Sequence, residues 1–170
     1  MITTDILIVG GGIVGVSIAK ELASRYPDLN ITLLEKEAAV ARHASGRNSG
    51  VLHAGFYYSP DSLKAKFTVE GNKLLTDYCL RHNLTINRCG KIVVAKDAEE
   101  LEGIFELKRR GDKNGVTLEI VDENRLTELE PNARTFDKAL YSPTTSVVNP
   151  TEVVEHIARN LKGNVKILLN

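Results

Sequence analysis

Three glycines and one acid are the first residues whose types and spacing indicate chemistry. Gly10, Gly12 and Gly15 fit the pattern G-x-G-x-x-G, and Glu35 follows at the distance that is typical of dinucleotide-binding folds. The first glycine permits a tight turn, and the second lets backbone approach a pyrophosphate. The third lets a helix lie close to a strand. An acid at this distance accepts hydrogen bonds from ribose hydroxyls. The set therefore predicts a dinucleotide site.

These residues need a strand–helix–strand unit to bring them together, and the flanking sequence predicts one. Ile6–Val9 is a continuous apolar run, which is typical of a strand buried in a parallel sheet. Residues 13–24 carry the apolar stripe of a helix, whose first N–H groups would face the phosphates. Residues 31–34 form a second apolar strand that closes on Glu35. The acid disfavours a 2′-phosphate, although Lys36 beside it leaves NADP open.

The segment from Arg42 to Tyr58 is rich in Gly, Ser, Asn, His and Tyr. A typical NAD domain would continue here into another helix and strand. A backbone rich in glycine and serine can instead run close over a flat ring or a pyrophosphate. NAD and FAD share the glycine pattern, so the glycines alone leave both cofactors open.

The run H-A-S-G-R-N-S-G-V-L-H-A-G-F-Y-Y, followed by S-L-K-A-K-F-T-V-E-G-N, closely resembles the L-2-hydroxyglutarate dehydrogenase/oxidase family. That family belongs to the FAD-dependent oxidoreductases that include D-amino-acid and glycine oxidases. The resemblance continues through C-G-K-I-V-V-A, N-G-V and N-P-T-E-V-V, and so covers essentially the whole chain. Some relatives carry His at the position of Arg47.

The resemblance implies that FAD binds with its adenosine end on residues 10–15 and Glu35. Its flavin end would lie along residues 45–50, near His53. The cofactor contacts expected on this basis are Gly10, Gly12, Ile13, Val14, Gly15, Glu35, Lys36, His43, Ser45, Arg47, Asn48, Ser49 and Gly50.

The reaction implied is oxidation of L-2-hydroxyglutarate, or a similar 2-hydroxy acid, to 2-oxoglutarate, with hydride transfer to flavin N5. A base must take the hydroxyl proton, and His53 is the first catalytic candidate because imidazole titrates near neutral pH. His53 could equally do no more than hydrogen-bond the flavin or the backbone. His43 is a second candidate, interpreted as a positioning residue. Arg47 could pair with a carboxylate or phosphate, or be a solvated loop residue.

The expected fold class is α/β. It combines a Rossmann-like, glutathione-reductase-like FAD-binding domain with part of an α+β mixed-sheet substrate domain. The FAD-binding domain is predicted over residues 1–85 and 148–170, and the partial substrate domain over residues 86–147. The further elements predicted are a helix ending at Asn83, a strand over 86–95 with a bulge at Gly90, a helix over 97–113, a strand over 116–121, a helix over 123–130, a strand over 139–142, a helix opened by Asn149 and a strand over 165–169.

Composition narrows the class of protein. Lys+Arg and Asp+Glu both number 22, so bulk electrostatic binding to nucleic acid has no support. The two cysteines are interpreted as ordinary thiols, and no cluster has metal-ligand spacing. A cytoplasmic location and a small-molecule substrate are expected. The electron acceptor, oxygen or a quinone, stays open, and a quinone would bring peripheral contact with the inner membrane.

Family members are more than twice as long as these 170 residues, so the chain is expected to be an N-terminal fragment with little activity alone. Two alternatives within this framework are an amine or amino-acid oxidase of the same superfamily and a non-catalytic nucleotide-binding remnant. A plain NAD-binding module is a third. A flavin absorption spectrum separates the last from the others.

Overall fold

The computed structural model describes residues 3–170 and divides the chain into two compact units. Unit 1 is Met1–Gly50 together with Asn149–Asn170, and unit 2 is Val51–Val148. Unit 1 has one sheet and unit 2 has two, and each unit has its own helices.

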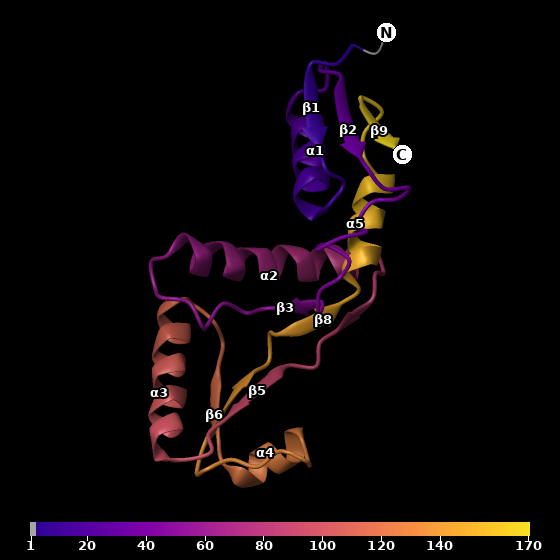
Figure 1. Ribbon diagram of the computed structural model, residues 1–170. Helices are drawn as coiled ribbons and strands as arrows, with labels where there is room; N and C mark the ends of the chain where they lie inside the picture. The colour runs from indigo at the N-terminus through magenta and orange to yellow at the C-terminus, as the bar shows by residue number, and fades with distance from the viewer. Residues whose placement is uncertain (1–2) are drawn as a thin grey trace. The chain divides into compact units, whose positions relative to one another are not determined.

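Unit 1 is built on a three-stranded parallel sheet. Its strands are β1 (Ile6–Val9), β2 (Ile31–Glu35) and β9 (Val165–Leu169), in the order β1-β2-β9. Figure 1 shows the three strands side by side, with α1 (Ile13–Arg25) following β1. The predicted strands and the predicted helix after the glycine turn are confirmed to within one residue. A mixed α/β architecture with a parallel βαβ unit at its start is therefore present.

The two helices of unit 1 pack against each other. Helix α1 buries Val16, Ala19 and Ala23, whose spacing places them on one side of the helix. The second helix, α5, spans Pro150–Arg159 and begins with proline at its first turn, where a missing N–H costs nothing. The Oδ1 atom of Asn149 accepts a hydrogen bond from the Glu152 N–H over 3.2 Å, which confirms the predicted helix start.

Unit 2 contains two small antiparallel sheets and three helices. The sheets are β3 (Val51–Leu52), β8 (Ser146–Val148) and β4 (Ile86–Asn87), in the order β3-β8-β4, and β5 (Lys91–Val94), β7 (Ala139–Ser142) and β6 (Glu119–Val121), in the order β5-β7-β6. The helices are α2 (Leu63–Arg81), α3 (Ala98–Lys113) and α4 (Glu123–Leu129). This is the predicted α+β composition.

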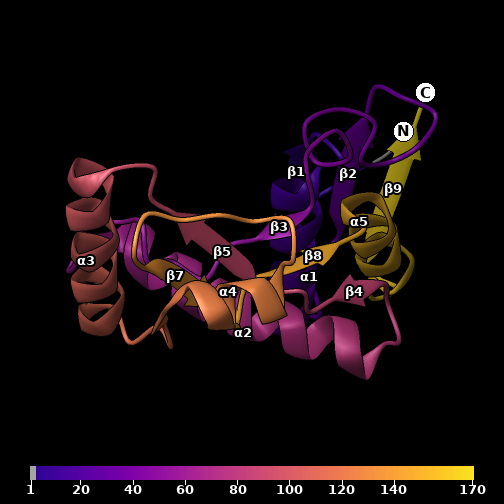
Figure 2. The ribbon, with the colours of Figure 1, turned by 90° about the horizontal axis from the view of Figure 1, so that it is seen from below.

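The core of unit 2 lies on both faces of β7. Leu140 packs with Ile104 of α3 in one apolar cluster, whereas its neighbour Ala139 packs with Leu126 of α4 in another. Successive residues of a strand point to opposite faces, which explains this division. Figure 2 shows α3 and α4 beside β7.

Two sequence-based element assignments were wrong. The strand predicted over residues 86–95 is two strands in different sheets, because Gly90 adopts φ +72° and its N–H bonds to the Thr145 carbonyl. A Cβ on Gly90 would lie 2.6 Å from the Tyr141 ring, so the break requires glycine. The strand predicted over residues 116–121 begins at Glu119.

The boundary between the units also differs from the predicted domain boundary. Residues 51–85, which were assigned to the FAD-binding domain, pack with residues 86–148. The physical reason is that β3 pairs with β8. In addition, the Asn72 amide of α2 donates to the carbonyl of Leu52 in β3 and to that of Thr144, which lies just before β8. The assignment of a function to each part of the chain stays a prediction.

Candidate cofactor-binding site

The turn between β1 and α1 depends on two glycines. Gly10 adopts φ +108°, a conformation that L side chains rarely reach. A Cβ on Gly15 would overlap the carbonyl oxygen of Gly10, so no larger residue fits at the point where the helix crosses the turn. The roles predicted for these two positions, a tight turn and close helix–strand packing, match this geometry.

Glu35 is tied directly to the glycine turn. Its Oε2 atom accepts a hydrogen bond from the Gly11 N–H over 2.6 Å, and its Oε1 atom accepts one from the Glu37 N–H over 2.9 Å. A Cβ on Gly11 would lie 3.0 Å from the same carboxylate oxygen, which makes Gly11 a close-approach position that the sequence pattern did not single out.

These two backbone donors hold Glu35 in its charged form. The N–H groups of Glu37 and Gly11, in that order of effect, lower the pKa of the carboxyl group below its ordinary value, although burial acts in the opposite direction. An ionised carboxylate with further lone pairs at the end of β2 is what a ribose hydroxyl needs as an acceptor.

Ser45 caps α1 from a distant part of the chain. Gly12 occupies the N-cap position and has no side chain for this task, so the Ile13 N–H donates to the Ser45 hydroxyl over 2.9 Å. Within residues 3–170, the N–H groups of Gly12 and Val14 have no acceptor. Two donors at the positive end of the helix thus stay available for an anion.

The loop that carries Ser45 is held by close backbone contacts. Ala41 adopts φ +61° and donates its N–H to the Gly11 carbonyl over 3.1 Å. A Cβ on Gly46 would overlap the Ala41 carbonyl oxygen. The Asn48 amide donates to the Ala44 and Ser45 carbonyls, and its Oδ1 accepts the N–H of Gly50. Asn48 therefore shapes the loop.

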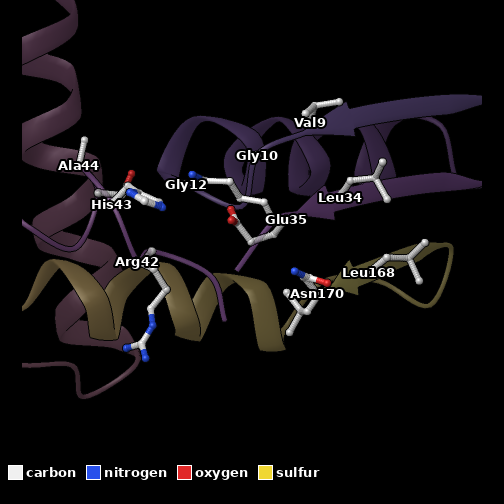
Figure 3. A pocket seen from close by; sticks show the side chains of 14 residues that line it. Val9, Gly10, Gly12, Leu34, Glu35, Arg42, His43, Ala44, Leu168 and Asn170 are labelled. Atoms are coloured by element: carbon white, nitrogen blue, oxygen red, sulfur yellow. The ribbon is translucent and has the colours of Figure 1, made fainter. Parts of the chain in front are cut away.

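A pocket of about 650 Å³ opens at the carboxyl ends of the three parallel strands. Its apolar floor includes Val9, Leu34 and Leu168, which are aligned in register across β1, β2 and β9. Figure 3 shows the Glu35 carboxylate directed toward the glycine turn. Six of the predicted cofactor residues line this pocket: Gly10, Gly12, Glu35, Lys36, His43 and Ser45.

The other predicted contacts of unit 1 lie around this pocket without lining it. Ile13, Val14 and Gly15 form the first turn of α1. Arg47, Asn48 and Ser49 are exposed, and Gly50 is buried with φ +68°. Pocket residues that the sequence did not single out are Ala41, Arg42, Ala44 and Asn170.

His43 is paired across the rim of the pocket. Its Nε2 atom lies 2.7 Å from Oε1 of Glu37, and Lys36 lies 3.6 Å from the same oxygen. The hydrogen bond with His43 lowers the pKa of Glu37 below its ordinary value. This pairing favours a positioning role for His43.

His53 belongs to unit 2, where two asparagines hold its loop. The Asn72 amide, buried on α2, donates to the carbonyls of Leu52, His53 and Thr144. Asn114, after α3, donates to the carbonyls of Gly55 and Tyr58. The sequence analysis missed both residues. Asn114 was noted only as part of the N-G-V motif of the family resemblance.

The surroundings of His53 favour the neutral form of its ring. Burial is the larger cause that lowers the pKa of His53 below its ordinary value, and the positive charge of Lys91 acts in the same direction. A neutral imidazole can accept a proton, which is the state that a general base requires.

The residues of unit 1 fit the adenosine and pyrophosphate parts of FAD. The glycine turn leaves a surface without side chains beside two available N–H donors, and the ionised Glu35 lies within the same pocket. Among residues 3–170, no group of three His, Cys, Asp or Glu side chains could hold a metal ion. No helix within that range is both long enough and apolar enough to cross a membrane.

Comparison with protein families gives a direct match. The profile described as "DAO: FAD dependent oxidoreductase" matches residues 5–170. The chain is 45% identical over 150 residues to the mitochondrial L-2-hydroxyglutarate dehydrogenase of Nematostella vectensis, covering 88% of this chain and 33% of that protein. It is 40% identical over 155 residues to the L-2-hydroxyglutarate dehydrogenase of Escherichia coli K12, covering 91% and 36%.

Solved structures give the same architecture. The L-α-glycerophosphate oxidase of Mycoplasma pneumoniae with FAD bound superposes with a TM-score of 0.88 at 30% identity, covering 99% of this chain and 45% of that one. The L-proline dehydrogenase of P. horikoshii superposes with a TM-score of 0.84 at 24% identity, covering 98% and 44%. These matches confirm the predicted fold class. The chain spans about a third to two fifths of the curated relatives' length.

Proposed function

The chain belongs to the family of FAD-dependent oxidoreductases, and from this premise we propose that it serves the oxidation of L-2-hydroxyglutarate to 2-oxoglutarate. Membership of the family confirms FAD as the expected cofactor and speaks against a plain NAD-binding module. The observation that carries the proposal is the identity of 38–45% to proteins named L-2-hydroxyglutarate dehydrogenase, over 85–98% of this chain.

FAD supplies the hydride acceptor for the C2–H bond of the substrate. Unit 1 provides the residues for its adenosine end: Glu35 for the ribose, and the N–H groups of Gly12 and Val14 for the pyrophosphate. His43 and Lys36 stay predicted contacts at the rim of the pocket.

His53 takes the proton of the C2 hydroxyl in this proposal. Its lowered pKa keeps the ring neutral at pH 7, so a proton acceptor is present before the substrate binds. Asn72 acts through His53, because its amide donates to the backbone carbonyl of His53 and so fixes the main chain that carries the imidazole ring. Asn72 is thus a positioning residue.

The electron acceptor in this proposal is oxygen or a quinone. The proposed location is cytoplasmic, with peripheral membrane contact if the acceptor is a quinone. Support for these points comes from the sequence alone.

The test is anaerobic reduction of the flavin in a chimeric protein. Residues 1–170 of this chain replace the matching segment of the E. coli relative, because the chain spans about a third of that protein. We expect the purified chimera to contain FAD and its flavin absorbance near 450 nm to bleach with L-2-hydroxyglutarate, while 2-oxoglutarate accumulates. Glycine and D-alanine are the controls. A chimera that holds FAD but is bleached by an amino acid, or by none of these compounds, contradicts the proposal.

A further inference from the structure

A half-buried lysine without a carboxylate partner lies beside the loop that holds His53. Lys91 is the first residue of β5, where its backbone pairs with Ser142 of β7. Its Nζ atom lies 4.7 Å from the centroid of the Tyr57 ring. Lys91 takes part in none of the ion pairs found within residues 3–170. A lysine that contacts an aromatic face but no carboxylate can still pair with an anionic ligand.

The surroundings of Lys91 are fixed by packing. The Tyr57 ring stacks at 4.3 Å on Phe56, which is 1% exposed and belongs to the main apolar cluster of unit 2. Tyr57 itself is 37% exposed, so one side of the pair with Lys91 stays open to solvent. The loop that carries Tyr57 is held by Asn72 at one end and by Asn114 at the other. The aromatic side of the contact with Lys91 is therefore held in place.

Backbone contacts tie both residues to the same turn: the N–H of Gly90, next to Lys91, bonds to the Thr145 carbonyl, and the Asn72 amide bonds to the carbonyls of His53 and Thr144. The charge of Lys91 also contributes to the lowered pKa of His53. An ammonium group and an imidazole ring are thus held by neighbouring parts of unit 2. A 2-hydroxy acid presents a complementary pair: a C1 carboxylate, which needs a cation, on the carbon next to the C2 hydroxyl, which needs a proton acceptor.

We propose that Lys91 binds the C1 carboxylate of the 2-hydroxy acid, with the aromatic face of Tyr57 beside it, so that the C2 hydroxyl is presented to His53. This inference rests on the proposed function and adds to it a residue for substrate binding. It assigns recognition in unit 2 to the 2-hydroxy-carboxylate group rather than to the distal C5 carboxylate. Monocarboxylic 2-hydroxy acids therefore bind through the same lysine.

The chain contains a matched control for this lysine. Lys64 lies 4.4 Å from the centroid of the neighbouring Tyr58 ring, so it makes the same kind of cation–π contact in the same segment. Lys64 is exposed and does not contribute to the pKa shift of His53. A general attraction between this surface and anions would involve both lysines, whereas a built site involves Lys91.

The experiment is a histidine NMR titration of the full 170-residue chain, with the His53 signal assigned by its loss in His53→Gln. L-2-hydroxyglutarate and L-2-hydroxybutyrate are added separately to the wild type and to Lys91→Met, Lys91→Arg and Lys64→Met. We expect both ligands to perturb the His53 signal of the wild type. Lys91→Met should weaken the affinity for both ligands at least tenfold. Lys91→Arg and Lys64→Met should change these affinities less than threefold.

Several outcomes overturn the inference. One is equal binding by the wild type and Lys91→Met, and another is equal weakening in Lys91→Met and Lys64→Met. A loss of L-2-hydroxyglutarate affinity alone would assign Lys91 to the C5 carboxylate instead, and no response of His53 to either ligand would remove the site. FAD affinity and chimera bleaching are measured separately, so failure of the proposed function is recognised by those readouts.

Discussion

The backbone N–H of Gly11 donates to the Oε2 atom of Glu35 over 2.6 Å, and so joins the glycine turn after β1 to the acid at the end of β2. Two features that the sequence separates by the whole of α1 thereby form one surface of the pocket. In the proposed function this bond positions the acid for the adenosine part of FAD, so that binding depends on the charge of a single carboxyl group.

Replacing Glu35 with Gln removes that charge while nearly preserving the shape of the side chain. The variant loses charge-assisted bonds from Gly11 and Glu37, each of a kind that contributes about 1.5–3 kcal/mol. We expect FAD affinity, followed by quenching of flavin fluorescence, to fall roughly 10- to 100-fold. Glu21→Gln, which breaks an exposed ion pair with Arg25 on α1, is the control. Equal affinities in the two variants would exclude Glu35 from the site.

Glu35 should also shape the acid stability of the protein. Its pKa is lower in the folded state than in the unfolded state, so its ionised form stabilises the fold at pH values above the ordinary carboxyl pKa of about 4.3. This stabilisation is lost as the pH falls below that value and through the lowered folded pKa. The free energy of unfolding, measured by urea denaturation, should therefore fall more steeply on acidification in the wild type than in Glu35→Gln. Parallel curves would contradict the prediction.

Gly15 is expected to tolerate no side chain. In Gly15→Ala the new Cβ meets the Gly10 carbonyl, and the helix must move away from the turn. The free energy of unfolding should drop by about 1–3 kcal/mol, with loss of FAD binding. Gly163→Ala, in the same unit and with no atom within 4 Å of the new Cβ, should change neither quantity. Chemical denaturation and flavin fluorescence measure both, and similar behaviour of the two variants would disprove the packing argument.

Asn72 is expected to stabilise the loop of His53. Asn72→Ala leaves the carbonyls of Leu52, His53 and Thr144 without their shared donor. The cost should be about 1–3 kcal/mol of unfolding free energy, because a buried polar group without a partner is expensive. Hydrogen exchange should become faster in this loop. Asn87→Ala, at an exposed position of β4, serves as the comparison and should leave exchange there unchanged.

The pH dependence of flavin reduction in the chimera tests the role of His53. A general base works when neutral, so the rate should rise through a pKa below the ordinary histidine value of about 6.5 and level off by pH 7. In Lys91→Met the rise should shift to higher pH, since a neighbouring positive charge is gone. In His53→Asn the rise should disappear and the rate fall. An unchanged profile in His53→Asn would mean that the base lies elsewhere.

The strand–turn–helix unit was predictable because each of its parts obeys a local rule. Apolar runs gave β1, β2 and β9, and the glycine spacing predicted both the turn after Val9 and the close approach at Gly15. Capping chemistry gave the start of α5 at Asn149. These features depend on residues that are near one another in the sequence.

What the sequence did not predict depends on distant contacts. The break at Gly90 is set by the Tyr141 ring and the Thr145 carbonyl, which lie more than 50 residues further along the chain. Ser45 serves as the cap of α1 because Gly12 has no side chain, although 32 residues separate the bonded pair. The two-residue strand β3 exists because β8 pairs with it. The sequence alone carries no local signal for such partners.

In the proposed function, this chain binds FAD through its adenosine end in the pocket around Glu35. The most direct test is a titration of FAD with the purified chain, followed by flavin fluorescence, with ADP and FMN as competitors. We predict that FAD is bound, that ADP displaces it, and that FMN does not. Absence of FAD binding, or displacement by FMN as effective as that by ADP, would contradict the account.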